Sequence, residues 1–323
     1  MLKERIMKTL LKIGALLAFL TNLSFASPVA LPSDFLSKAS PKVKELVIKN
    51  KMEVIEYNYV LNAIGDGTRK NSNAIILDAR PLKKYQTGHI PSALALPDTK
   101  FDEMYSKVLG KTSKNKEIII YCGGYACAKS PKVAIMLAKK GYTNVKVYAA
   151  GMPQWSKKSY SEIDTNVAKA IFDKRSSALF IDARPYGKFI GSTIVGAIGV
   201  PDTKFEDYAK FMPADKKAML VPFCGGYNCH KSHVVAKHLL KMGYTNIKVY
   251  AAGFPEWKKA KFPTTGGGVA VVAKKSSSGE TMSKSGAVKK GADTGTVDGE
   301  WFKANLSKLP SSVTLVDVRD AKD

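Results

Sequence analysis

Short apolar runs alternate with amphipathic segments through the middle of the chain. The runs at 74–77, 118–121 and 145–148 are largely apolar, which is typical of strands buried on both faces of a parallel sheet. Residues 132–140 instead carry their apolar side chains at helical spacing, and Gly141 follows as a stop signal. Strands that alternate with helices in this way predict an α/β fold with a parallel sheet.

The same pattern occurs twice. Residues 121–158 and 223–260 align without gaps, and 24 of the 38 positions are identical. The shared pieces include CGGY-x-C-x-KS, GYTN, KVYAAG and P-x-W, and PDTKF recurs upstream at 97 and 201. Each repeat of about 100 residues has the size of a compact domain rather than of a solenoid repeat.

These repeats divide the chain into domains. An N-terminal segment, 27–50, precedes a first domain at 51–158 and a second domain at 159–262. Gly, Ser and Lys dominate 263–296, a composition typical of a flexible linker. Residues 297–323 then begin a third copy of the Asp-Ala-Arg pattern, with Asp317 and Arg319, and the sequence stops four residues later. We expect this last piece to be the start of a truncated third domain that cannot fold alone.

The first 26 residues have the pattern of a secretory signal peptide. A basic region precedes the short apolar core 13–20, and small residues stand at the end of the segment, at Ser24 and Ala26. We expect cleavage after Ala26 and a periplasmic location, with no stable membrane insertion after cleavage. An uncleaved N-terminal anchor is the alternative.

Composition narrows the classes of function. The chain is 45% hydrophobic, which excludes general disorder. It carries a net charge of +24, but only six of its 51 basic residues are Arg, the residue that nucleic-acid readers favour. We therefore expect no nucleic-acid partner, and we expect the positive field to favour small anionic substrates.

All four cysteines lie in two Cys-x4-Cys loops. Each opening cysteine, Cys122 or Cys224, directly follows an apolar strand, and a helix follows the loop. Backbone N–H groups and a helix N-terminus at such a loop stabilise anions and lower the pKa of a thiol. We predict Cys122 and Cys224 as nucleophiles. The predicted substrate-binding loops comprise Gly123, Gly124, Tyr125, Ala126, Cys127, Lys129 and Ser130, and Gly225, Gly226, Tyr227, Asn228, Cys229, Lys231 and Ser232.

The second cysteine of each loop, Cys127 or Cys229, has three interpretations. It could resolve a persulfide or form a regulated disulfide with its partner, it could be a small structural hydrophobe, or it could help to bind a metal. His230 and His233 stand near Cys229, but the first loop has no histidine there. A metal site shared by both repeats is therefore not expected.

The ends of two other strands carry an Asp-Ala-Arg motif. Asp78 and Arg80 in the first repeat correspond to Asp182 and Arg184 in the second. Because buried Asp and Arg are seldom left unpaired, we predict structural ion pairs that support the cysteine loops.

Together, these motifs resemble the rhodanese-like (thiosulfate sulfurtransferase-like) family. The resemblance rests on Asp-x-Arg, on Gly-His-Ile-Pro-Ser-Ala at 88–93, on the cysteine loop and on the closing segments at Trp155 and Trp257. It implies tandem α/β domains, each a five-stranded parallel sheet flanked by helices. It also implies a persulfide on Cys122 and Cys224, with no metal or organic cofactor. The loops are longer than the family's usual pattern, and Cys127 and Cys229 stand where Arg is usual.

The resemblance implies a sulfurtransferase. Sulfane sulfur would pass from a small anionic donor, thiosulfate or polysulfide, through the cysteine to a thiol, cyanide or protein acceptor. A sulfur-carrier or thiol-redox binding module is one alternative. An oxyanion phosphatase or arsenate reductase on the same scaffold is the other, and the absence of Arg from both loops argues against it.

Overall fold

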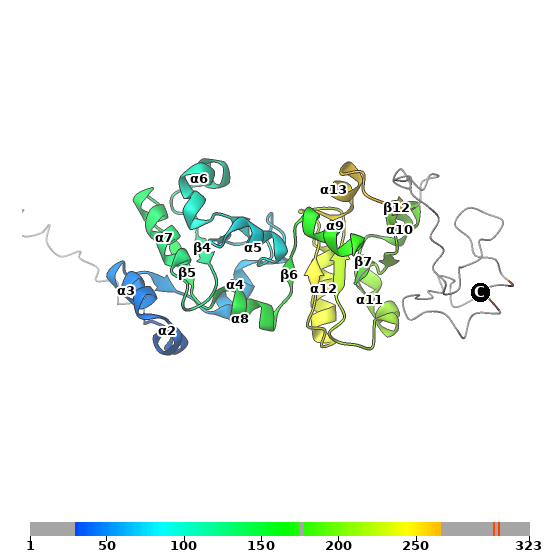
Figure 1. The fold of residues 1–323 in the computed structure, drawn as a ribbon, viewed down its shortest axis with the longest axis horizontal. Coiled ribbons are helices and arrows are strands. Elements are labelled where there is room, and N and C mark those ends of the chain that lie inside the picture. The colour runs from blue at the N-terminus through cyan, green and yellow to red at the C-terminus, as the bar shows by residue number, and fades with distance from the viewer. Residues whose placement is uncertain (1–29, 175–177, 266–299, 301–302, 304–323) are drawn as a thin grey trace, which may run out of the picture. The chain divides into compact units, whose positions relative to one another are not determined.

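The computed structural model describes residues 30–174 and 178–265, together with Glu300 and Lys303 (Figure 1). The signal peptide expected at 1–26 lies outside the described residues, as do nearly all of the third domain expected at 297–323 and most of the linker. No helix in the described part of the chain combines the length and apolarity needed to cross a membrane.

By their contacts, the described residues form two units. The first contains 30–64, 73–82 and 93–155, and the second contains 65–72, 83–92 and the chain from residue 156 onward. The segments 65–72 and 83–92 lie within the first repeat but group with the second unit. Their hydrogen bonds explain this grouping, since the backbones of His89 and Glu162 bond to each other in both directions, at 3.0 and 2.9 Å.

Helices and short strands alternate along both repeats. Through the first repeat they are α2 (Ser33–Lys38), α3 (Pro41–Lys49), β1 (Glu53–Val54), α4 (Tyr57–Ala63), β2 (Ile75–Asp78), α5 (Leu82–Thr87), β3 (Leu94–Ala95), α6 (Phe101–Leu109), β4 (Ile118–Tyr121), α7 (Lys129–Lys139), β5 (Val145–Tyr148) and α8 (Gly151–Lys158). They continue with β6 (Ser161–Glu162), α9 (Thr165–Asp173), β7 (Leu179–Asp182), α10 (Tyr186–Gly191), β8 (Thr193–Ile194), β9 (Ile198–Gly199), α11 (Phe205–Tyr208), β10 (Leu220–Phe223), α12 (Lys231–Lys241), β11 (Lys248–Val249), α13 (Gly253–Lys259) and β12 (Thr264–Thr265).

The first unit contains a five-stranded parallel sheet in the order β1-β5-β4-β2-β3. Every residue of the central strand β4 is buried, as its apolar run predicts. Helix α7 packs on β4 and β5. It begins three residues before the predicted segment and ends just ahead of Gly141, whose φ of +86° lies in the left-handed region. The predicted fold class is confirmed.

The second unit repeats this sheet, but the pairing between β10 and β11 is weaker. Strands β10-β7-β9 form one ladder and β11-β6 another, and two isolated parallel bridges join β10 to β11, at Leu220–Ile247 and Phe223–Tyr250. Pro222 lies between those bridges, where the first unit has Ile120. Proline has no N–H to give to the ladder. The five strands therefore keep the same order, with fewer bonds in the middle of the sheet.

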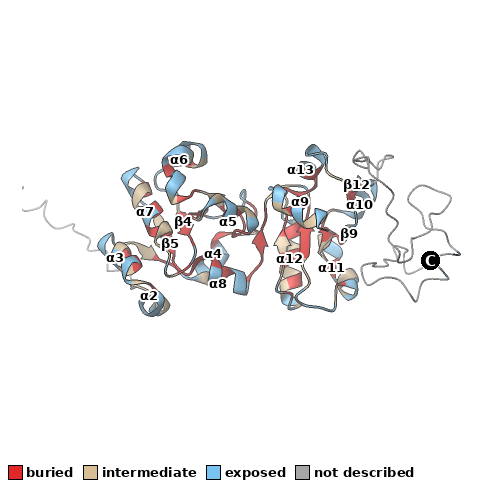
Figure 2. Cartoon of the chain, in the orientation of Figure 1, coloured by how far each residue is buried: buried red, intermediate tan, exposed pale blue. Residues whose placement is uncertain are grey.

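The central strands are buried on both faces, since every residue of β4 and of β10 is buried (Figure 2). In the second unit, Ile181 and Leu239 belong to a cluster on one face, and Phe180 and Trp257 to a cluster on the other. Trp155 and Trp257 are both fully buried. The closing tryptophans are therefore core residues.

The second domain extends slightly beyond its predicted end. Thr264 and Thr265, which the sequence places at the start of the linker, form β12 and pair antiparallel with Ile194 and Thr193. The indole N–H of Trp257 also donates to Pro263 O at 2.9 Å. Both contacts hold this stretch against the domain, which corrects the predicted linker boundary.

Candidate active site

Each opening cysteine lies at the carboxyl end of the central strand of its sheet. Cys122 directly follows β4 and Cys224 directly follows β10, and each loop leads into a helix, α7 or α12. Their exposed fractions are only 1% and 0%. The chain therefore places both predicted nucleophiles at the bottom of a strand–loop–helix turn, where the crevices of open α/β sheets bind ligands.

A glycine from the next strand end packs against each loop. Gly151 has a φ of +56°, and a Cβ on it would lie 2.3 Å from Cys122 O and 2.9 Å from Gly124 N. Gly253 stands in the same relation to Cys224 O, also at 2.3 Å. The neighbouring amide of Met152 donates to Cys122 O at 3.0 Å. The repeated KVYAAG motif was the signal for this support, and the sequence analysis did not assign it a role.

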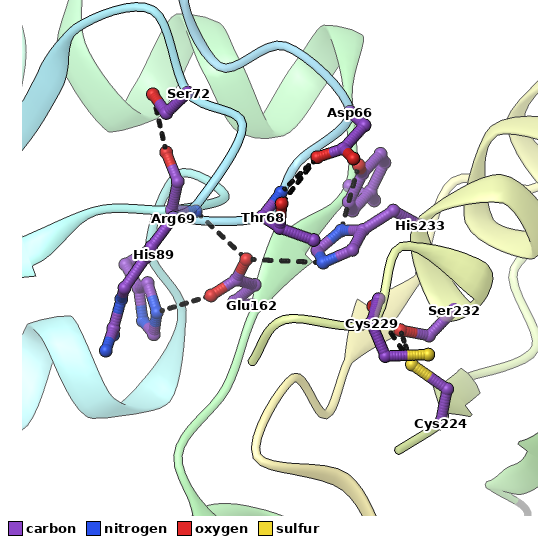
Figure 3. Close-up of polar contacts among 12 residues, drawn as sticks. Asp66, Thr68, Arg69, Ser72, His89, Glu162, Cys224, Cys229, Ser232 and His233 are labelled. Atoms are coloured by element: carbon purple, nitrogen blue, oxygen red, sulfur yellow. Dashed lines mark hydrogen bonds and ion pairs between the residues drawn. The ribbon is translucent and has the colours of Figure 1, made fainter. Parts of the chain in front are cut away.

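The sulfur of each opening cysteine has the same two partners in both units. The Cys122 thiol donates to Cys127 O at 3.1 Å and lies 3.1 Å from Ser130 Oγ. In the second loop, Cys224 Sγ lies 3.0 Å from Cys229 O and 3.2 Å from Ser232 Oγ (Figure 3). Because a carbonyl can only accept, this geometry keeps a proton on the opening sulfur.

The second cysteines are more accessible and more acidic. Cys127 and Cys229 are only partly buried, and all four cysteines are free thiols. Hydrogen bonding from Cys122 lowers the pKa of Cys127 to about 6, against the effect of burial, and the Gly123 and Lys129 amides and the Lys129 charge lower it further. The pKa of Cys229 is likewise lowered to about 6, chiefly by hydrogen bonding from Cys224.

The pKa values of the opening cysteines are shifted in the opposite direction, upward. The hydrogen bond to Cys127, followed by burial, raises the pKa of Cys122. Burial, followed by the hydrogen bond to Cys229, raises that of Cys224. The prediction that the opening thiols have lowered pKa values is therefore wrong. In the first loop the Gly123 and Lys129 amides and the Lys129 charge act on the second sulfur, whereas the Ser130 amide acts on the first.

Each loop lysine is held by a carboxylate that the sequence analysis missed. Lys129 Nζ lies 2.7 Å from Asp98 Oδ1, and Lys231 Nζ lies 2.8 Å from Asp202 Oδ1. Both aspartates are less than 10% exposed. They belong to the PDTKF segments, whose recurrence in both repeats was the available signal. Each ammonium group is thus already paired with a carboxylate before any substrate arrives.

The predicted Asp–Arg ion pairs are present. Arg80 Nε and Nη2 donate to both carboxylate oxygens of Asp78 at 2.6–3.0 Å, and Asp182 and Arg184 form the same bidentate pair. Both aspartates are fully buried. In the first unit the hydroxyl of Tyr121, the residue before Cys122, also donates to Asp78 Oδ2 at 2.8 Å. The ion pair is therefore linked to the base of the loop.

The remaining predicted loop residues form the outer part of each loop. Gly124 and Gly226 have φ values of +103° and +110°, which turn the backbone over the sulfur. The other predicted outer positions, partly or fully exposed, are Gly123, Tyr125, Ala126, Gly225, Tyr227 and Asn228. In the second unit, the guanidinium of Arg69 lies 4.5 Å from the centroid of the Tyr227 ring. No feature of the sequence pointed to Arg69.

A buried polar cluster lies behind the second loop (Figure 3). The Glu162 carboxylate accepts from Ser92 N at 3.0 Å and lies 3.2 Å from His89 Nε2. His233, which directly follows Ser232, has Nε2 3.8 Å from Glu162 Oε1 and Nδ1 3.2 Å from the Tyr160 hydroxyl. Pro131 stands in place of His233 in the first repeat. The two sites thus differ in what supports the serine.

Comparison with known proteins decides the family. The sequence model of the rhodanese-like domain matches this chain twice, at 58–158 and 164–260, which is more than half of the 323 residues. The chain belongs to the rhodanese-like family. Its two matches each contain one of the Cys-x4-Cys loops described above. The sequence-based family prediction is confirmed, as is the tandem arrangement of rhodanese-like domains.

Curated proteins of different kinds are similar to part of this chain. An HTH-type transcriptional regulator of Mycobacterium tuberculosis is 30% identical over 27% of the chain and 36% of its own length. A tRNA uridine(34) hydroxylase of Buchnera aphidicola is 26% identical over 35% of the chain and 42% of its own. The chain thus spans less than half the length of these curated relatives.

Among solved structures, a thiosulfate sulfurtransferase of Pseudomonas aeruginosa is 20% identical, with a TM-score of 0.30 over 67% of this chain and 44% of its own. A rhodanese-like domain from an Anabaena protein is 17% identical, with a TM-score of 0.30 over 41% of this chain and 96% of its own. The family assignment rests on the two domain matches.

Proposed function

We propose that this rhodanese-like protein is a sulfurtransferase that carries sulfane sulfur as a cysteine persulfide on Cys122 and on Cys224. The observation that carries the proposal is the position of each cysteine at the end of a central strand. There the loop backbone, a serine hydroxyl and a helix N-terminus surround the sulfur. Both units contain the arrangement in full, so each is expected to work.

The proposed donor is a small anion with an S–S bond, such as thiosulfate or a polysulfide. Attack of a cysteine thiolate on its sulfane sulfur forms the persulfide and releases the remainder of the donor, sulfite in the case of thiosulfate. A thiophilic acceptor, cyanide or a thiol on a small molecule or protein, then removes the sulfur. The net positive charge of the chain supports the anionic class of donor.

The test is thiocyanate formation from cyanide and a sulfane donor. Cys122→Ser and Cys224→Ser should each leave partial activity, because the other loop is intact, and the double variant should lower the rate at least about a hundredfold. The variants should keep the far-ultraviolet circular dichroism of the parent. A double variant that turns over at the parental rate would remove both residues from the reaction.

The same assay separates an enzyme from a sulfur carrier. A carrier would take up no more than one sulfur per loop and would release it only to its partner protein, without repeated turnover. A sulfurtransferase should form many equivalents of thiocyanate per chain. Mass spectrometry of the cysteine peptides after exposure to the donor should find the loaded residues in either case.

A further inference from the structure

The two sulfurs of each loop differ in access and in protonation. Cys122 and Cys224 are at most 1% exposed, and their thiols lie within hydrogen-bonding distance of both the carbonyl of the second cysteine and a serine hydroxyl. Cys127 and Cys229 are partly exposed. A donor that approaches from solvent therefore meets the second sulfur first.

The second sulfur also occupies the best place for a thiolate in the loop. A Cβ built on Gly123 would lie 3.8 Å from Cys127 Sγ, so this sulfur packs against the start of the loop, where the backbone turns. Cys122, the Gly123 and Lys129 amides and the Lys129 charge lower the pKa of Cys127 to about 6. A thiol with a lowered pKa forms the thiolate more readily, and the thiolate is the nucleophilic form.

The second loop repeats this arrangement with different neighbours. Cys229 Sγ would lie 3.9 Å from a Cβ on Gly225, and Cys224, the Gly225 and Lys231 amides and the Lys231 charge lower the pKa of Cys229 to about 6. The outer residue Ala126 of the first loop is replaced by Asn228 in the second. The pairing of a buried thiol with an accessible anionic sulfur is therefore common to both units.

We propose that Cys127 and Cys229 are catalytic residues that accept the sulfane sulfur from the donor and pass it to Cys122 and Cys224, so that each loop is a two-cysteine relay. This inference rests on the proposed sulfurtransferase function and adds a first acceptor to it. The opening cysteine remains the residue that stores the sulfur.

The relay consists of two balanced displacements. First, the Cys127 thiolate attacks the sulfane sulfur of the donor. A bond forms between Cys127 Sγ and that sulfur, the sulfane sulfur's bond to the rest of the donor breaks, and the remainder of the donor leaves with the electron pair. With thiosulfate the products are a Cys127 persulfide anion and sulfite.

In the second step, the Cys122 thiol transfers its proton to the terminal sulfur of this persulfide, and Cys122 Sγ attacks the same sulfur. The new Cys122–sulfur bond forms, the Cys127–sulfur bond breaks, and its electron pair returns to Cys127 as a thiolate. The products are a Cys122 persulfide and the original Cys127 thiolate. No external oxidant or reductant is consumed.

The test uses the full chain with one loop silenced. In a Cys224→Ser/Cys229→Ser background only the first loop can load. The parent, Cys122→Ser, Cys127→Ser and Cys127→Ala forms of that background are mixed with thiosulfate or with polysulfide. They are then quenched with an alkylating agent at times from milliseconds to minutes and mapped by mass spectrometry. Urea unfolding of each form controls for folding.

Three expectations follow from the relay. Cys122→Ser should accumulate the persulfide on Cys127. Loading of Cys122 should slow at least about tenfold at pH 7 in both Cys127 variants. The ionisable groups that act on Cys127 are Cys122 and Lys129, whose ammonium Asp98 holds. The loading rate of the parent should therefore rise with a midpoint near pH 6, and the Cys127 variants should lose this midpoint and need a higher pH.

The outcomes separate the relay from the proposed function. If Cys127→Ser and Cys127→Ala load Cys122 at the parental rate with the parental pH profile, Cys127 is only structural and the relay is wrong. The same holds if Cys122→Ser takes no sulfur on Cys127 while the parent loads. If the parent itself loads no cysteine, the sulfurtransferase function fails first. The mirror experiment, in a Cys122→Ser/Cys127→Ser background, repeats the test on Cys229.

Discussion

At the scale of single residues, backbone contacts shape each cysteine loop as much as side chains do. The carbonyl of Cys122 accepts the Met152 amide, the carbonyl of Cys127 accepts the Cys122 thiol, and Gly151 allows the close approach. A residue whose role is to have no side chain can therefore be as necessary to the site as the nucleophile. This dependence can be tested without changing any reacting atom.

Gly151→Ala should unfold or distort the first site. Its φ of +56° is unfavourable for alanine, and the new Cβ would lie 2.3 Å from a backbone oxygen that cannot move independently. We expect a loss of at least about 2 kcal/mol in the free energy of unfolding, together with loss of sulfur loading at Cys122. Urea unfolding followed by Trp155 fluorescence in a Trp257→Phe/Trp301→Phe background measures the first effect.

Gly141→Ala is the matched control. Its φ of +86° is also left-handed, but an added Cβ would meet nothing within 4 Å. This variant should lose only about 1 kcal/mol and should load sulfur normally. Equal losses in the two variants would show that the close approach to Cys122 O is unimportant.

At the scale of elements, local pattern was enough to predict most of what positions the site. Strands β4 and β5 have the predicted bounds, and β2 is displaced by one residue, because apolar runs and helix stops are properties of neighbouring residues. The direction of the pKa shifts in the cysteine pairs was not predictable. It depends on which sulfur donates to the carbonyl of the other cysteine.

Contacts between distant segments explain the other failures. Lys129 pairs with Asp98, which lies 31 residues earlier, and Glu162 pairs with His89, 73 residues earlier. Spacing along the chain does not specify such pairs. The weak pairing between β10 and β11 could have been anticipated, because a proline in an otherwise apolar central strand always removes one N–H donor from the ladder.

At the scale of the whole molecule, the two units share a Cys-x4-Cys loop but differ in what lies behind it. In the second unit, burial lowers the pKa of His233. Burial alone would raise the pKa of Glu162, but the hydrogen bond to His89, the His89 and His233 charges and the Ser92 amide lower it on balance. No corresponding histidine follows Ser130 in the first unit. The stability of the two units should therefore respond differently to acid.

We expect the second unit to lose stability as the pH falls below about 6.5. The unfolded His233 binds a proton near that pH, whereas the folded residue has a lowered pKa and stays neutral, so acid favours unfolding. Glu162, whose folded pKa is also lowered, adds a further loss below about pH 4.5. Urea midpoints from Trp257 fluorescence in a Trp155→Phe/Trp301→Phe background measure the trend.

His233→Gln supplies the comparison for this prediction. It should be less stable than the parent at pH 7, by about 1–3 kcal/mol, because a buried partner of Tyr160 is altered. Its urea midpoint should change less between pH 7 and pH 5. A parental pH slope in this variant would assign the acid sensitivity to other groups.

The neutralised lysine of each loop has a consequence for selectivity. Since Asp98 and Asp202 hold the ammonium groups, the uncharged N–H dipoles of the loop backbone would have to hold an incoming anion. Dipoles of fixed geometry discriminate by shape and by where the charge sits more than by total charge. Abundant dianions without an S–S bond, such as sulfate, would then gain little from the site. On a chain of net charge +24, both loops would therefore stay free to bind a scarce sulfur donor even when sulfate is abundant.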